Sequence, residues 1–255
     1  MSTIFHTGFY KEPITPLLKE RISKDKEYYS NLGWCDSKGV INDLKYVTDK
    51  NGLRNEFIPT VNNPIALGCS DTFGVGTFKH HLWTTILSNF IGKNIYNCGI
   101  PGGSVKTCFR VLKRVIEDIG ILPSTVFMLT PKKYRTEFMV TDSKSEYRMQ
   151  VGPNFHEVLD GEMEQFKPLC KDLFEKIYSL EENVNIESEA YKLAIEHICS
   201  VNKIPIYFID NFNSYTSFMS ENKKVVKAYD CGHLGPDYQA EIAQKFFEKY
   251  MLKKL

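Results

Sequence analysis

Residues 65–76 read IALGCSDTFGVG. The apolar run at 65–67 ends at a glycine, which predicts a buried strand that stops in a tight turn. Residues 78–91 follow with apolar side chains at helical spacing, so a helix is expected next. A strand, a sharp turn and a helix place Ser70 at the carboxyl end of the strand, where open parallel sheets hold their active sites. This stretch alone leaves two roles for Ser70, a nucleophile or a serine that caps the helix.

The rest of the chain repeats the alternation of strand and helix. Further strands are expected at 94–97, 125–129, 204–209 and 225–229. Further helices are expected at 105–119, 162–178, 187–201 and from Pro236 onward. Such alternation predicts a parallel sheet joined by right-handed crossovers. We therefore expect a three-layer α/β/α, flavodoxin-like fold with a central parallel sheet of about five strands.

Two regions fall outside this rhythm. Residues 1–60 are polar, tyrosine-rich and irregular, and we expect an N-terminal extension packed on the main domain at 61–255. Residues 130–160 contain proline, glycine and many charges, and a loop of that length is usually functional or disordered. Because this insertion leaves the third strand at its carboxyl end, we expect it to cover the site and narrow the entrance to Ser70.

The C-terminal stretch 225–252 reads VVKAYDCGHLGPDYQAEIAQKFFEKYML. Asp230 and His233 lie three residues apart in a glycine-rich turn just before the last helix. Together with Ser70 they supply the parts of an acyl-transfer triad. The alternative is structural, with Asp230 capping the turn and His233 at the surface.

These blocks resemble those of the SGNH (GDSL-type) hydrolases. Residues 68–76, GCSDTFGVG, are similar to the GCS-x-T-x-G-x-G variant of bacterial and phage-encoded members. Residues 97–104, NCGIPGGS, are similar to the second block, with Gly99 matching its glycine. Asp230 and His233 match the fourth block. Residues 46–54, YVTDKNGLR, resemble a Y-x-T-(D/N)-x-x-G-F-R segment found upstream in some members.

The resemblance implies a role for each matched residue. Ser70 would attack an ester carbonyl, His233 would carry the proton, and Asp230 would orient the imidazole. The backbone N–H groups of Ser70 and Gly99 would stabilise the oxyanion.

The asparagine that the family places after the third strand is missing, since the sequence there reads LTPKKYR at 129–135. We expect the Thr130 hydroxyl to replace it as a donor and Arg135 to face the substrate.

The leading hypothesis is a serine esterase that hydrolyses an ester, such as an O-acyl group on a carbohydrate. Two alternatives stay open. One is an acyltransferase that uses the same serine, and the other is a non-catalytic binding or structural protein with this fold, such as a virion component. The expected partner is a small-molecule or carbohydrate ester. The sequence leaves open whether the protein forms a homo-oligomer or assembles into a virion.

Composition excludes several other classes. The net charge is +1, from 32 basic and 31 acidic residues, which argues against a nucleic-acid partner. No apolar stretch reaches about 18 residues and no signal peptide is visible, so we expect no membrane span and synthesis in the cytoplasm, followed by release or association with a virion. Seven cysteines without a C-x-x-C pair indicate reduced thiols. No nucleotide-binding motif is present and His80 and His81 are adjacent, so no cofactor and no metal are expected.

Overall fold

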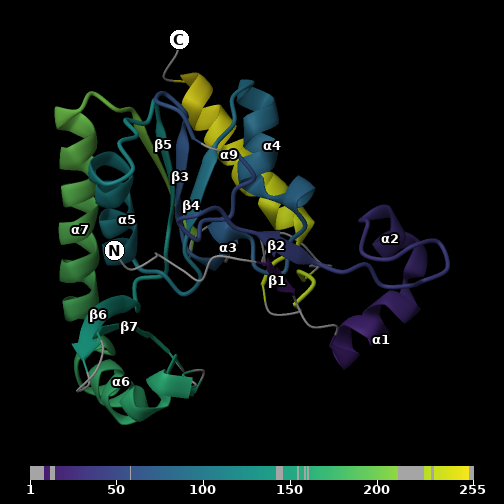
Figure 1. Ribbon diagram of the computed structural model, residues 1–255, viewed down its shortest axis with the longest axis horizontal. Helices are drawn as coiled ribbons and strands as arrows, with labels where there is room; N and C mark the ends of the chain where they lie inside the picture. The colour runs from purple at the N-terminus through teal and green to yellow at the C-terminus, as the bar shows by residue number, and fades with distance from the viewer. Residues whose placement is uncertain are drawn as a thin grey trace.

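The computed structural model in Figure 1 describes residues 9–11, 15–57, 59–141, 146–153, 155–157, 159, 161–211, 227–230 and 233–252. Its centre is a sheet of four parallel strands in the order β4-β3-β5-β8. The strands are β3 (Ile65–Gly68), β4 (Tyr96–Gly99), β5 (Val126–Thr130) and β8 (Ile206–Asp210). The expected α/β fold with a central parallel sheet is confirmed.

The sheet has one strand fewer, within the described residues, than the sequence predicts. Residues 225 and 226 of the expected last strand lie outside the described residues, and Lys227 makes only an isolated bridge with Leu234. The Ala228 N–H donates to the His233 carbonyl at 2.9 Å. The described part of this segment therefore turns back on itself instead of pairing with β8.

Helices cover both faces of the sheet (Figure 1). The helices are α5 (Val105–Glu117) and α7 (Glu181–Val201) on one face, and α4 (Trp83–Ile91) and α9 (Pro236–Leu252) on the other. Leu67 and Met128 pack in the layer with α5, whereas Ala66 and Phe127 pack in the layer with α9. Successive side chains of a strand point to opposite faces, so each buried strand contributes to two cores.

The insertion expected as an irregular loop contains a β-hairpin. Strand β6 (Thr136–Thr141) pairs antiparallel with β7 (Glu146–Val151). Figure 1 shows the hairpin beyond the end of the sheet where α3 (Ser70–Phe73) lies. Met149 and Val151 pack with Cys170 of α6 (Lys167–Leu173) in a separate small core. The expectation of a loop is wrong because the many charges alternate with apolar residues, which is a pattern that strands accommodate.

The remaining described elements are shorter. They are β1 (Phe9–Lys11), α1 (Pro16–Lys24), α2 (Lys26–Asn31), β2 (Lys45–Val47), η1 (Lys79–His81), η2 (Phe155–Glu157), η3 (Gly161–Phe166) and η4 (Phe174–Tyr178). The helix expected at 162–178 is thus three pieces, η3, α6 and η4. No described helix is long and apolar enough to cross a membrane. The six described cysteines have free, buried thiols: Cys35, Cys69, Cys98, Cys108, Cys170 and Cys199.

The N-terminal segment shares a core with the end of the sheet that carries α3. Trp34 and Tyr46 are 1% exposed and pack in one cluster with Phe73 and Tyr229. Figure 1 shows α1 and α2 to one side of the main body, while β1 and β2 lie next to it. Two distant parts of the chain, near residues 73 and 229, therefore meet on side chains of the N-terminal segment.

Arg54 ties this segment to the turn that follows Ser70. Its Nη1 donates to the carbonyls of Phe73 and Gly74 at 3.1 and 2.6 Å, and its Nη2 donates to that of Thr77 at 2.8 Å. The guanidinium also lies 4.5 Å from the centre of the Tyr46 ring. Because Arg54 is only 7% exposed, these contacts compensate for the burial of its charge.

The neighbouring Asn55 bonds to the outer edge of β4. Its Oδ1 accepts from the Asn97 N–H at 2.8 Å, and its Nδ2 donates to the Asn97 carbonyl at 3.0 Å. The side-chain amide thus pairs with one residue of β4 as a backbone amide of a neighbouring strand would.

Candidate active site

Ser70 is the first residue of α3, directly beyond the end of β3. It is 6% exposed, and the turn is closed by the Gly74 N–H, which donates to the Ser70 carbonyl at 2.7 Å. The Ser70 hydroxyl makes one weak contact, with Cys69 Sγ at 4.0 Å. Among the described residues, no hydrogen bond joins Ser70 to His233. The hydroxyl is therefore uncommitted.

Asp230 and His233 form a tight pair. His233 Nδ1 lies 2.5 Å from Asp230 Oδ2, and the His233 backbone N–H donates to Asp230 Oδ1 at 3.2 Å. A carboxylate on Nδ1 fixes the ring and leaves Nε2 as the nitrogen that can accept a proton. The His233 side chain is 31% exposed, so this nitrogen is not sealed from a ligand.

The turn with Asp230 packs on the turn that follows Ser70. The Tyr229 N–H donates to the Gly76 carbonyl at 2.7 Å. Gly76 has φ +68°, and a Cβ there would stand 2.5 Å from Asp230 Oδ1. A glycine is needed at this position both for its backbone conformation and for the approach of the carboxylate. Gly76 thus allows the turn after Ser70 and the turn with Asp230 to meet.

The charges around His233 favour its protonated form. Burial opposes the imidazolium, but the hydrogen bond to Asp230 and the negative charges of Asp71 and Asp230 outweigh it and raise the pKa of His233. The positive charge of Arg135 acts in the opposite direction. His233 therefore interacts with residues from three separate segments, including the neighbour of Ser70.

Asn211 is a site residue that the sequence reading missed. It is 2% exposed, directly beyond β8, and its Nδ2 donates to Asp71 Oδ2 at 2.9 Å. The Tyr238 hydroxyl of α9 donates to Asn211 Oδ1 at 2.6 Å, and Gln239 Nε2 donates to the Asp71 carbonyl at 3.0 Å. These bonds attach the Ser70 turn to α9. The available signal was a polar residue at the carboxyl end of the strand expected at 204–209.

Gly99 is not available as an oxyanion donor in this arrangement. Its N–H donates to Asn97 Oδ1 at 2.9 Å, and its Cα lies so close to α3 that a Cβ would be 2.2 Å from the Phe73 nitrogen. The N–H of Gly102, three residues on, makes no hydrogen bond within the described chain, and neither does that of Ser70. The expectation for Gly99 is corrected on this ground, and Gly102 is the glycine of the second block with a free donor.

Thr130 and Arg135 lie in different surroundings. Thr130 ends β5 opposite Asp210, and alternation along the strand places it on the same face as Met128. The Arg135 guanidinium lies 5.4 Å from the centre of the Phe155 ring. Its Nη1 is buried and, within the described residues, has no hydrogen-bond partner. Because its charge also acts on His233, Arg135 is the better placed of the two to meet a ligand's oxygen.

Glu137 fastens the hairpin to α5. This carboxylate is 4% exposed and accepts from Thr107 Oγ1 at 2.9 Å, from Arg110 Nε at 2.6 Å and from Arg148 Nη1 at 3.3 Å. Although burial opposes the carboxylate, the bonds and charge of Arg110 and the charge of Arg148 lower the pKa of Glu137.

Gln150 of the hairpin contacts the loop of the second block. Its Nε2 donates to the Pro101 carbonyl at 3.0 Å. Gly102 has φ +73°, and a Cβ at Gly102 would lie 2.1 Å from Gln150 Oε1. The hairpin therefore touches the loop that carries the free Gly102 donor. In the described part of the chain, no group of three His, Cys, Asp or Glu residues could hold a metal ion.

No protein-family model and no curated protein matches the sequence. Several solved structures have a similar arrangement. A protein from Desulfitobacterium hafniense described as a lipolytic protein of the G-D-S-L family has 13% identity and a TM-score of 0.37, over 73% of this chain and 98% of that chain. The psychrotrophic esterase EstA from Pseudoalteromonas has 12% identity and a TM-score of 0.38, over 75% and 99%. An acetyl xylan esterase from the rumen bacterium Butyrivibrio proteoclasticus has 10% identity and a TM-score of 0.39, over 84% and 67%.

Proposed function

We propose that this protein is a serine esterase of SGNH type, with Ser70 as nucleophile, His233 as general base and acid, and Asp230 as the residue that orients His233. The observation that carries the proposal is the 2.5 Å contact between Asp230 and His233 on a turn bonded to Gly76. A carboxylate on Nδ1, a free Nε2 and a buried, uncommitted serine hydroxyl on the adjoining turn are the parts that acyl transfer requires.

The reaction would proceed in two halves. Ser70 Oγ forms a bond to the ester carbonyl carbon while His233 Nε2 takes the hydroxyl proton, and the C–O bond to the alcohol then breaks as His233 returns the proton to that oxygen. Water attacks the acyl-enzyme with His233 again as base, which releases the acid and restores Ser70. Because catalytic hydrogen bonds are often long before substrate binds, the Ser70–His233 contact would form in the complex.

The oxyanion would be stabilised by the N–H groups of Ser70 and Gly102. A third donor is needed in place of the family's asparagine, since removing one donor typically costs about 10²–10³ in rate. The unpartnered Nη1 of Arg135 supports that residue as the donor, with Thr130 as the alternative. The proposed substrate is an O-acyl group on a carbohydrate or another small ester.

The test is hydrolysis of p-nitrophenyl acetate by the full chain. We expect Ser70→Ala and His233→Ala each to lower kcat/KM by at least about 10³-fold, because the triad acts as a unit. A fluorophosphonate should label the wild-type chain once, on Ser70. Ser23→Ala is the matched control, because the Ser23 hydroxyl bonds only to its own helix at the surface.

Hydrolysis and labelling that survive in Ser70→Ala would assign the nucleophile elsewhere. A correctly folded wild type that neither hydrolyses esters nor reacts with the fluorophosphonate would instead support the non-catalytic alternative. Transfer of the acyl group to added sugar faster than to water would identify an acyltransferase that uses the same residues.

A further inference from the structure

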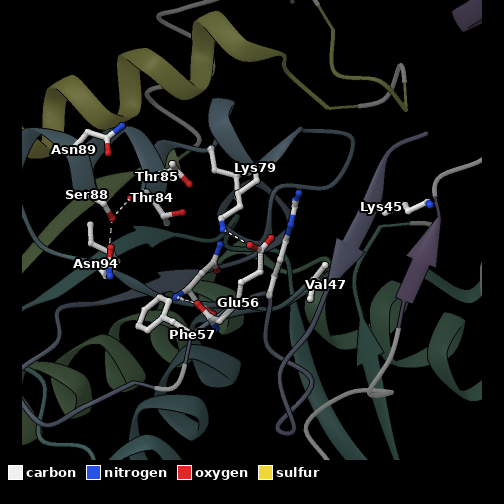
Figure 2. Close-up of a pocket in the computed structure, with 15 residues that line it drawn as sticks. Lys45, Val47, Glu56, Phe57, Lys79, Thr84, Thr85, Ser88, Asn89 and Asn94 are labelled. Atoms are coloured by element: carbon white, nitrogen blue, oxygen red, sulfur yellow. Dashed lines mark hydrogen bonds and ion pairs between the residues drawn. The ribbon is translucent and has the colours of Figure 1, made fainter. Parts of the chain in front are cut away.

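A cavity of about 280 Å³ lies between the N-terminal segment and the edge of the sheet. Figure 2 shows side chains of α4 on one side of it, and Glu56 and Phe57 of the N-terminal segment on the other. Its lining does not include Ser70, Asp230 or His233. The volume is close to the lower end of ligand pockets, about 300 Å³, so it suits one ring-sized group.

The wall formed by α4 carries polar groups without partners. Thr84, Thr85 and Asn89 line the cavity, and within the described residues none of their side chains makes a hydrogen bond. Thr84 as a whole residue is only 3% exposed, but its hydroxyl is not sealed off and is accessible from the cavity that Thr84 lines. Hydroxyls and amides both donate and accept, so together they match a ligand that is itself rich in hydroxyl groups.

The charges at the cavity are already paired or directed elsewhere. Lys79 Nζ lies 2.6 Å from Glu56 Oε2, and the Arg54 guanidinium donates to three backbone carbonyls. Lys45 is exposed, and Figure 2 shows it apart from the other side chains. This arrangement favours an uncharged ligand over an anion.

A second cavity of about 400 Å³ adjoins the first and shares Asn55, Glu56 and Phe57 with it. The Phe57 ring is partly buried, with its centre 6.1 Å from that of Tyr96. An aromatic ring that lines both cavities offers an apolar surface to the C–H face of a sugar ring. The two cavities could therefore hold successive units of one chain.

From these features we propose that the paired cavities around Phe57 bind uncharged sugar units of a glycan. The glycan proposal deepens the proposed function, because it names a carbohydrate as the alcohol part of the ester substrate. Only that assignment rests on the esterase proposal. Binding of a sugar without an ester needs no catalysis.

The experiment measures binding of four uncharged oligosaccharides to the full chain by saturation-transfer NMR and calorimetry: xylotetraose, cellotetraose, chitotetraose and maltotetraose. We expect saturable binding of at least one of them, with little dependence on salt because the sugars carry no charge. Thr84→Val should weaken it about three- to tenfold, the range for one lost hydrogen bond, without lowering the thermal midpoint. Phe57→Leu should weaken it further, and Gln244→Ala, at an exposed amide of α9, should change nothing.

Three results would overturn the proposal. In the first, none of the four sugars binds. In the second, a sugar binds but Thr84→Val and Phe57→Leu leave its affinity unchanged. In the third, only a heparin tetrasaccharide binds, and its affinity falls steeply with salt. Hydrolysis of p-nitrophenyl acetate by the same variants separates the two proposals, because Thr84→Val should retain it. Sugar binding by a chain that hydrolyses no ester would retain the glycan site and reject the esterase.

Discussion

His233 is held by two carboxylates with different tasks. Asp230 contacts Nδ1 directly, whereas Asp71 acts through its charge and is itself fixed by Asn211. A general base must be neutral to accept a proton. A raised pKa of His233 therefore shifts the pH at which activity begins to rise to a higher value. Asp71 therefore helps to set the pH range of the proposed enzyme without touching the imidazole.

The substitution Asp71→Asn tests this role of the Asp71 charge. The amide oxygen can still accept from Asn211, but the negative charge near His233 is gone, and the pKa of His233 should fall. In wild type the acidic limb of kcat/KM for p-nitrophenyl acetate should lie above the ordinary histidine value of about 6.5. In Asp71→Asn it should move to lower pH. Asp118→Asn, which changes an exposed charge, is the control, and a limb that stays in place would remove Asp71 from this role.

At the scale of elements, the hairpin is attached to the domain through a buried charge. Glu137 of β6 accepts hydrogen bonds from two residues of α5 and one of β7, so the hairpin and the helix after the second block share one ionic network. Removing one partner of such a network leaves the remaining charges buried without compensation.

We therefore predict that Glu137→Gln lowers the free energy of unfolding by about 3–5 kcal/mol at pH 7, measured by urea denaturation. Because the pKa of Glu137 is lowered by folding, its contribution is present above the unfolded value of about 4.3 and is lost as pH falls through the folded value. The deficit of the variant should consequently shrink in acid. Glu175→Gln, in an exposed pair with Lys171, should cost less than about 1 kcal/mol. Equal costs in the two variants would contradict the network.

At the scale of the whole molecule, the N-terminal segment is part of the site's support. The three carbonyls that Arg54 binds belong to the turn that follows Ser70. A planar guanidinium can serve them together, whereas a lysine ammonium carries its donors on one atom.

Arg54→Lys should therefore lower the free energy of unfolding by about 2–3 kcal/mol, since hydrogen bonds from charged groups contribute about 1.5–3 kcal/mol each. It should also reduce kcat for p-nitrophenyl acetate and speed hydrogen exchange at residues 74–77. The matched control is Arg114→Lys, whose partner Asp118 is at the surface. If hydrogen exchange at residues 74–77 stayed slow in a destabilised Arg54→Lys variant, the turn would keep its shape without the Arg54 hydrogen bonds.

The sequence predicted the alternating strands and helices well, because apolar runs bounded by glycine are compatible with few other arrangements. It also indicated Asp230 and His233, since a three-residue spacing is local. It could not reveal that the Gly99 N–H donates to the Asn97 side chain, because that side chain is also held by a bond from its Nδ2 to the Thr72 carbonyl, 25 residues away. Asn211 was missed for the same reason, as its partners lie 140 and 27 residues away.

The bonds of Asn55 to β4 bear on the behaviour of the protein at high concentration. A strand at the edge of a sheet exposes N–H and C=O groups that can recruit a strand from another molecule. Asn55 occupies both of these groups on Asn97, in the middle of a strand only four residues long. An incoming chain would have to displace a bonded side chain before it could extend the sheet at that edge. At the β4 edge, a single amide side chain therefore hinders the addition of a strand from another molecule.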